Sequence, residues 1–286
     1  MLEMIINPKK AEKRTWEMFF VGFLYSSVSI FLVNWFFAKD AVLSNYSGIL
    51  VVTFTVMFSI PFIYYTLKLE ERRINEQSGT FSLLKEHRKA LMAFMWLFLG
   101  FVVAFSLWYI LLSPVNSFKP QIETFCLINR PTNFQQCTEQ YGIKKATLST
   151  GFATSSNQLL YIFTNNIYVL IFTLVFSLIF GAGVIFILVW NASVIAAAIG
   201  IYAKSSLLQL PLGFARYMVI HGFFEILSYF TVALAGGMIS VAVVKHEFGT
   251  EKFWEVLQDS LNLIIFSIVV LFIAGLLEVY VTPLVF

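Results

Sequence analysis

The stretch ALMAFMWLFLGFVVAFSLWYILL, residues 90–112, decides the fold class of this chain because no charged residue interrupts it. An α-helix needs about 20 consecutive apolar residues to cross the hydrocarbon core of a bilayer, which is about 30 Å thick. Residues 90–112 reach that length without a break, so they predict a transmembrane helix.

Other stretches of the chain are apolar and long enough to cross a bilayer in the same way. They are Met18–Ala38, Ile49–Leu67, Leu159–Val189, Tyr217–Val244 and Ser260–Val281. The apolar stretch Ala192–Ala203 would be about 18 Å long as a helix, which is too short for a full crossing. It is either a short span completed by the leucines that follow it or a re-entrant half-helix packed against its neighbours. We therefore expect six long spans and one short or re-entrant helix, about seven helices in all.

The stretch Tyr217–Val244 would measure about 42 Å as a straight helix, which exceeds the thickness of the hydrocarbon core. A helix of that length has to tilt or bend in order to fit the bilayer. We expect it to tilt, or to bend at Gly236–Gly237.

The composition excludes a water-soluble globular protein. Hydrophobic residues make up 59% of the 286 residues and charged residues only 12%, whereas soluble domains carry about 25% charged residues. A membrane β-barrel would show alternating segments of about ten residues instead of long unbroken runs. A nucleic-acid-binding protein would show a basic stripe, but the basic residues here flank the apolar stretches. The composition predicts an all-α, polytopic helical bundle in contact with the lipid bilayer.

The positions of Lys and Arg predict the orientation of the chain, because short cytoplasmic loops carry an excess of these residues. The segment before the first span contains four of them, the loop after the first span contains one, and the loop after the second span contains six. These counts predict that the N-terminus lies in the cytoplasm. We expect the chain to be located in the cell membrane. The connection 114–158 is then extracytoplasmic.

The two cysteines, Cys126 and Cys137, both lie in this outer connection. A pair of thiols outside the cytosol is readily oxidised, so we expect a disulfide, which would stabilise the loop by about 2–3 kcal/mol. The alternative is a pair of free thiols. A zinc site is not expected, because the connection contains no His to complete one.

Few ionisable residues lie within the apolar stretches, and a charge there costs at least about 2.5–3.5 kcal/mol. His221 and Glu225 are four residues apart, so they share a helix face and can hydrogen-bond to each other. Glu278 lies near the end of the last stretch. The three residues predict either a structural pair that joins helices or a site that handles protons or ions. A metal-dependent hydrolase is a third alternative, although zinc usually has three protein ligands and we expect no metal.

The asparagines Asn165, Asn166 and Asn191 also lie within or beside the apolar stretches. Their amides would lack hydrogen-bond partners in lipid, so we expect them to face other helices. Small residues at intervals of four allow helices to approach closely. The expected packing positions are Gly181, Gly183, Ala192, Ala196, Gly200, Ala233, Gly236 and Gly237. They predict a tight inner bundle or a dimer interface.

The polar part of the chain is small. Residues 69–89 carry mixed charges and predict a solvated cytoplasmic linker, or a docking surface for a cytoplasmic partner. We divide the chain into an N-terminal extension of two spans with this linker, residues 1–89, and a membrane core, residues 90–286.

Several motifs in the C-terminal half resemble those of the stage II sporulation protein M family. In chain order they are Asn165-Asn166-Ile167, Gly181-Ala182-Gly183, Asn191, Leu210-Pro211, His221-Gly222 with Glu225, Ala235-Gly236-Gly237, and Leu277-Glu278 followed by Pro283. The resemblance is strongest over residues 157–286. It departs from the family pattern at Ala192, where a Gly is usual, and the first two spans look like an addition.

The resemblance implies a multi-pass membrane protein that anchors or organises partners and is not an enzyme. The family member of endospore formers belongs to a membrane complex with peptidoglycan-degrading enzymes. By this resemblance we expect a scaffold or subunit that binds other membrane proteins or forms a homo-oligomer, and that needs no cofactor. The alternative is a transporter, or the permease subunit of an ATP-driven exporter, that uses His221, Glu225 and Glu278.

Overall fold

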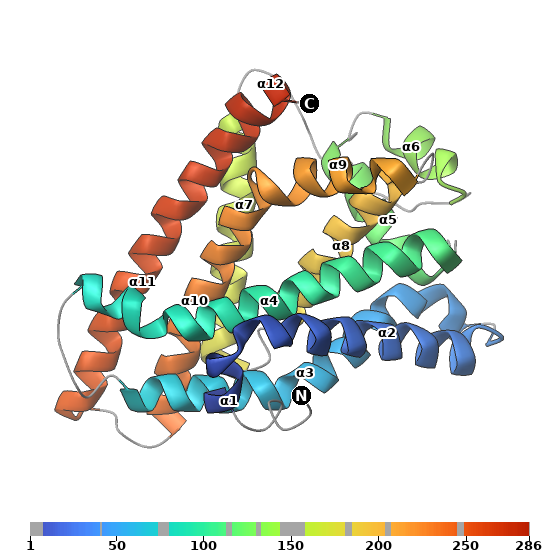
Figure 1. Cartoon of the computed structure of the whole chain (residues 1–286). Coiled ribbons are helices and arrows are strands. Elements are labelled where there is room, and N and C mark those ends of the chain that lie inside the picture. Colours follow the sequence, from blue (N-terminus) through green and yellow to red (C-terminus); the bar gives the residue numbers. More distant parts are fainter. Residues whose placement is uncertain are drawn as a thin grey trace.

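The protein is a bundle of helices long enough to cross a membrane (Figure 1). The computed structural model describes residues 8–40, 42–73, 80–112, 116–129, 133–143, 158–180, 185–203, 207–244 and 249–285. Every regular element within these residues is helical, and seven helices are long and apolar enough to span a bilayer. The expectation of an all-α polytopic bundle of about seven helices is confirmed.

The N-terminal part contains the first three spanning helices. The short helix α1 (Pro8–Lys13) and the 3-10 turn η2 (Thr15–Glu17) lead into α2 (Met18–Phe37). The 3-10 turn η3 (Leu43–Tyr46) leads into α3 (Ser47–Arg73), and α4 follows (Thr80–Leu112).

The remaining elements include two short helices, α5 and α6, and four further helices long enough to span a bilayer. Their bounds are η4 (Asn116–Phe118), α5 (Lys119–Asn129), α6 (Phe134–Gln140), α7 (Gln158–Phe180), α8 (Ile185–Ala203), η8 (Leu207–Gln209), α9 (Leu210–Phe214), η9 (Ala215–Val219), α10 (Gly222–Val244), α11 (Glu251–Leu276), η10 (Leu277–Val281) and α12 (Thr282–Val285). Figure 1 shows α9 and η9 crossing between the ends of α8 and α10.

The expected single span Leu159–Val189 is wrong, because two helices share this stretch. The helix α7 ends at Phe180 and α8 begins at Ile185, so Ala192–Ala203 belongs to a helix of 19 residues, about 28 Å long. Residues on both sides of the break are equally apolar, so hydropathy did not reveal it. The packing positions Gly181 and Gly183 lie outside the described residues.

The stretch Tyr217–Val244, which we expected to tilt or to bend at Gly236–Gly237, is not one straight helix, and α10 continues through both glycines without interruption. The chain turns at Ile220–His221, between η9 and α10. A Cβ on Gly222 would lie 2.4 Å from the carbonyl oxygen of Tyr217, so the turn needs a residue without a side chain at this position. Such local backbone contacts are not visible in hydropathy.

The helices α2 and α4 cross with their backbones in contact. A Cβ on Gly100 would lie 2.1 Å from the carbonyl oxygen of Phe19, and a Cβ on Gly22 would lie 2.2 Å from that of Leu97. Each helix therefore presents a glycine to the other. In lipid the hydrophobic effect does not drive helices together, so van der Waals contact between closely packed backbones stabilises the pair.

Small residues also line the contact between α8 and α4. Ala192, Ala196 and Gly200 are buried, and a Cβ on Gly200 would overlap the ring of Tyr109 on α4. The hydroxyl of Ser106 donates a hydrogen bond of 3.5 Å to the carbonyl oxygen of Ala196.

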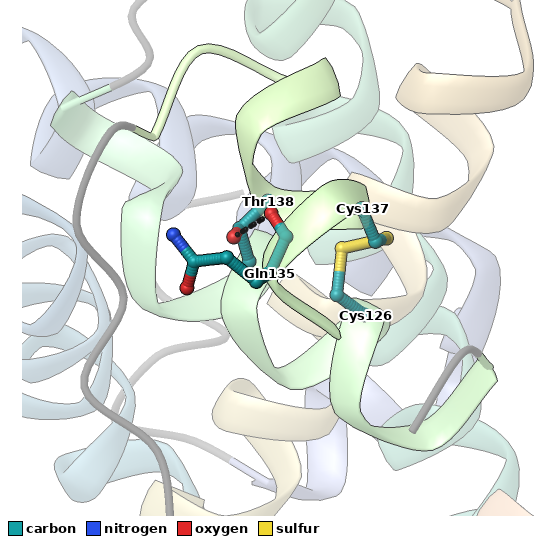
Figure 2. The surroundings of a disulfide bond; sticks show 4 residues. All are labelled: Cys126, Gln135, Cys137 and Thr138. Atoms are coloured by element: carbon teal, nitrogen blue, oxygen red, sulfur yellow. Dashed lines mark hydrogen bonds between the residues drawn. A yellow bond between two sulfur atoms is a disulfide. The ribbon is translucent and has the colours of Figure 1, made fainter. Parts of the chain in front are cut away.

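The helices α5 and α6 are joined by the disulfide Cys126–Cys137, with an S–S distance of 2.04 Å and the two Cα atoms 5.8 Å apart (Figure 2). Both cysteines are buried. The amide of Gln121 donates to the carbonyl oxygen of Gly48, which holds α5 against the start of α3. The expected disulfide is present.

The interpretation of residues 69–89 as a solvated segment is wrong at two positions. Glu70, near the end of α3, and His87, in the first part of α4, are both fully buried, and His87 Nδ1 lies 2.5 Å from Glu70 Oε2. The Nε2 atom of His87 is buried without a hydrogen-bond partner within the described part of the chain. Charge counting could not distinguish these two residues from their solvated neighbours, because burial depends on how α3 and α4 pack.

Candidate intramembrane polar site

The polar residues predicted within the spans lie at the ends of three helices that pack together. Asn166 is near the start of α7, His221 immediately precedes α10, Glu225 is in the first turn of α10, and Glu278 lies in η10 after the end of α11. Since α10 packs against both α7 and α11, these ends lie at the same end of the bundle (Figure 1). We call Asn166, His221, Glu225, Glu278 and Thr282 the polar site.

One hydrogen bond joins α7 to α10 within the polar site. The amide Nδ2 of Asn166 donates to Glu225 Oε1 over 2.6 Å. A hydrogen bond between an amide and a carboxylate in a region of low dielectric is stronger than the same bond in water. It therefore fixes the start of α7 against the start of α10.

A second contact joins α10 to the C-terminal end of the chain. His221 Nδ1 lies 3.2 Å from the hydroxyl of Thr282, whose Oγ1 donates to the carbonyl oxygen of Leu277. The spacing of His221 and Glu225 indicated that they could bond to each other. In the structure each has a hydrogen-bond partner on another element, so the two residues tie α10 to two different neighbours.

Two π-helical segments flank the polar site. The segment η9, Ala215–Val219, ends two residues before His221, and η10, Leu277–Val281, contains Glu278 and ends immediately before Thr282. The π-helix is rare and is frequently found at functional sites. The contact between His221 and Thr282 thus joins the ends of both irregular segments.

The two carboxylates of the polar site influence each other. Glu278 is close enough to Glu225 for an electrostatic interaction. Both glutamates are also close enough to the buried hydroxyl of Tyr229 to interact with it electrostatically. Arg216, in η9, is close enough to His221 for an electrostatic interaction between the two side chains. The side chains of His221, Glu225 and Glu278 are half-buried. The polar site therefore combines two acidic groups, an imidazole and a nearby cation at one end of the bundle.

Serine hydroxyls join the same three helices along the rest of their length. Ser177 on α7 donates to the carbonyl oxygen of Ala233 over 2.5 Å. Ser228 donates to Ser267 on α11, and Ser260 donates to Ala235 on α10. Gly236 fits over Ser177, and a Cβ there would lie 2.8 Å from the serine Cβ.

The three predicted asparagines differ in environment. Asn166 joins two helices, as described above. Asn191 donates to the carbonyl oxygen of Ile187 in its own helix. The side chain of Asn165 is exposed on α7 and is not buried against another helix within the described residues. Adjacent residues on a helix point in different directions, which separates Asn165 from Asn166.

Sequence reasoning missed Thr282 and Tyr229 as neighbours of the polar site. Neither residue stands out in an apolar stretch, because hydroxyl groups cost little in a helix that can satisfy them. Within the described residues, no group of three or more His, Cys, Asp or Glu residues is arranged to hold a metal ion.

Comparisons with known proteins give one family. A model of the family described as stage II sporulation protein M matches residues 11–283, and this match includes the first two spans. An uncharacterised protein of Methanocaldococcus jannaschii is 32% identical over 126 residues, which cover 43% of this chain and 69% of the relative. No solved structure gives a significant match.

Proposed function

The chain belongs to the stage II sporulation protein M family, and from this membership we propose that it is a non-enzymatic subunit of a membrane protein assembly. The observation that carries the proposal is that the polar residues within the spans form hydrogen bonds between helices. Asn166, Glu225, His221 and the serines of α7, α10 and α11 bond to neighbouring helices. Such bonds stabilise a framework to which other proteins can attach.

Purification from native membranes in a mild detergent tests this proposal. We expect the tagged protein to be recovered with stoichiometric partners or as a defined oligomer. Gly100→Val is an unfolded control, because disruption of the α2–α4 contact should remove any assembly that depends on the folded bundle. A folded protein that is strictly monomeric and carries no interacting protein would contradict the proposal.

We also propose an orientation, with the N-terminus in the cytoplasm and α5 and α6 outside the cell membrane. The distribution of Lys and Arg supports it, and a disulfide is favoured outside the cytosol. Exposed aromatic residues lie at both ends of the spans, Trp16 and Trp254 at one end and Trp35 and Tyr280 at the other, as expected at two membrane interfaces. Protease cleavage of a tag inserted between α5 and α6 should occur in intact cells, and protection would contradict this orientation.

Transport is the second candidate function, and a specific observation favours it. Two interacting carboxylates lie beside two π-helical segments at one end of the spans. Titratable groups within a membrane commonly mark ion or proton pathways. An ATP-driven exporter would need a separate ATPase subunit, for which residues 69–89 are the candidate docking segment.

Flux measurements in proteoliposomes test transport. Proton or ion flux that is lost in Glu225→Gln, while Asn165→Gln retains it, would support this second function. Equal behaviour of empty liposomes and liposomes that contain the protein would exclude it for the ions tested.

A further inference from the structure

The outward face of α7 is largely exposed. Only 22% of the residues in the span Ile162–Ile179 are buried, which is close to the 28% of the last span, Glu251–Val285, and far below the 72% of the span Gly222–Val244. The buried residues Asn166, Leu170, Thr173 and Ser177 face α10 and α11, and the opposite side of the helix is open. This open side is available to lipid or to another protein.

One edge of this face carries a polar residue within a regular repeat. Asn165, Tyr168, Phe172, Val175 and Ile179 are all exposed and are separated by three and four residues in alternation. We call these five residues the α7 stripe. Alternating steps of three and four form the heptad pattern through which two helices supercoil.

Asn165 distinguishes this stripe from an ordinary lipid-facing surface. Its exposed amide has one group that donates and one that accepts, and no hydrogen bond to it is found within the described residues. In lipid both groups would lack partners, and each unsatisfied group is costly. A protein that covers this face would therefore have to offer both a donor and an acceptor at the level of Asn165.

A second copy of the chain meets this requirement by symmetry. Two copies in one membrane have the same orientation, so a twofold axis between them runs along the membrane normal and makes their α7 helices parallel. In a parallel heptad pair, residues at the same position face each other across the axis. Asn165 of one copy can then donate to Asn165 of the other and accept from it.

We propose that the α7 stripe is a homodimer interface in which the two Asn165 amides hydrogen-bond to each other. Tyr168, Phe172, Val175 and Ile179 form the apolar part of this interface. The proposal rests on the proposed function in one respect, since it names a second copy of the chain as one partner in the assembly.

Cysteine cross-linking in native membranes tests the interface residue by residue. Both native cysteines are bonded to each other, so one introduced cysteine is the only free thiol. We expect oxidation to cross-link Asn165→Cys, Phe172→Cys and Ile179→Cys into dimers. The matched controls Ile171→Cys and Leu178→Cys lie on the other edge of the same exposed face and should remain monomeric.

A second measurement concerns the amide. Asn165→Leu should lower the dimerisation constant about three- to tenfold, as expected for one or two interhelical hydrogen bonds, and Asn165→Gln should restore most of it. Because Asn165 is exposed, the thermal stability of the monomer should not change.

Equal cross-linking at both edges of the face, or none at the α7 stripe, would overturn the homodimer interface. So would an unchanged dimerisation constant in Asn165→Leu. Each of these results would leave recovery of other proteins with the chain unaffected, so failure of this inference can be distinguished from failure of the proposed function.

Discussion

The helices α2 and α4 meet backbone to backbone, whereas α7, α10 and α11 meet through hydrogen-bonded side chains. At the α2–α4 contact, Gly22 and Gly100 bring each helix against a carbonyl oxygen of the other. At the second contact, Asn166, Ser177 and Ser228 each donate across a helix boundary. Both arrangements answer the same problem, which is that lipid provides no hydrophobic drive for helices to associate.

The difference predicts different responses to substitution. A backbone contact has no room to adjust, because neither helix can move a side chain out of the way. A hydrogen-bonded contact loses one bond at a time and keeps the rest. We therefore expect abrupt loss of folding at the first contact and graded loss at the second.

The largest effect is expected for Gly100→Val. The added carbons would overlap the backbone of α2 near Phe19, so the two helices have to separate along their crossing. We expect no monodisperse protein in size-exclusion chromatography. Gly275→Ala is the control, since its Cβ would lie 3.5 Å from Leu159, an ordinary contact, and the variant should behave as the unmodified protein does.

A buried ionisable pair provides a third kind of contact, between α3 and α4. His87→Leu removes one partner of the buried Glu70 carboxylate and should lower the free energy of unfolding by about 3 kcal/mol. Thermal unfolding in detergent measures this loss. The double variant with Glu70→Leu should recover part of the stability, because two apolar residues avoid a buried charge. A double variant less stable than His87→Leu would contradict the explanation.

An intermediate effect is expected for Asn166→Leu, which removes the hydrogen bond to Glu225. Interhelical hydrogen bonds in membranes contribute about 0.6 kcal/mol on average and at most about 1.7 kcal/mol, so we expect a loss of about 1 kcal/mol. The neighbouring Asn165→Leu should leave the stability of the monomer unchanged. Equal losses in the two variants would mean that the bond to Glu225 is not the cause.

The smallest effect is expected for Ser177→Ala. This change removes the hydrogen bond to the carbonyl oxygen of Ala233 but preserves the close fit against Gly236, so the loss should be about 0.6 kcal/mol. Ser177→Val replaces the hydroxyl with a methyl group and adds a second methyl group where Gly236 leaves little room, and we expect it to be the more harmful of the two. Both variants lack the hydrogen bond, so the reverse order, again from thermal unfolding in detergent, would mean that the close fit against Gly236 does not limit the size of this side chain.

The sequence predicted the fold class and the number of spans because long apolar stretches leave a helix in lipid as the only stable state. It did not predict the break between α7 and α8, since apolar residues lie on both sides. The turn before α10 depends on the contact between Gly222 and Tyr217, which hydropathy does not contain. Helix boundaries set by local backbone geometry were therefore the weak part of the prediction.

The polar site shows the same division. The free energy needed to place an ionisable side chain in lipid identified Glu225, His221 and Glu278 as unusual. That argument needs only their position in an apolar stretch. Their partners Asn166 and Thr282 lie 59 and 61 residues away in the chain, at distances that spacing cannot predict. The pair Glu70–His87 was missed because both residues sit among charges at the ends of their helices.

The sequence by itself determined that this protein lies in a membrane and crosses it as helices, because the free energy of transfer into lipid is a property of each residue and adds along the chain. Only the tertiary structure decided which helices touch, which carboxylate meets which amide, and which of two adjacent asparagines is left exposed. These choices depend on the rotation and crossing of helices, and contacts between distant parts of the chain fix both.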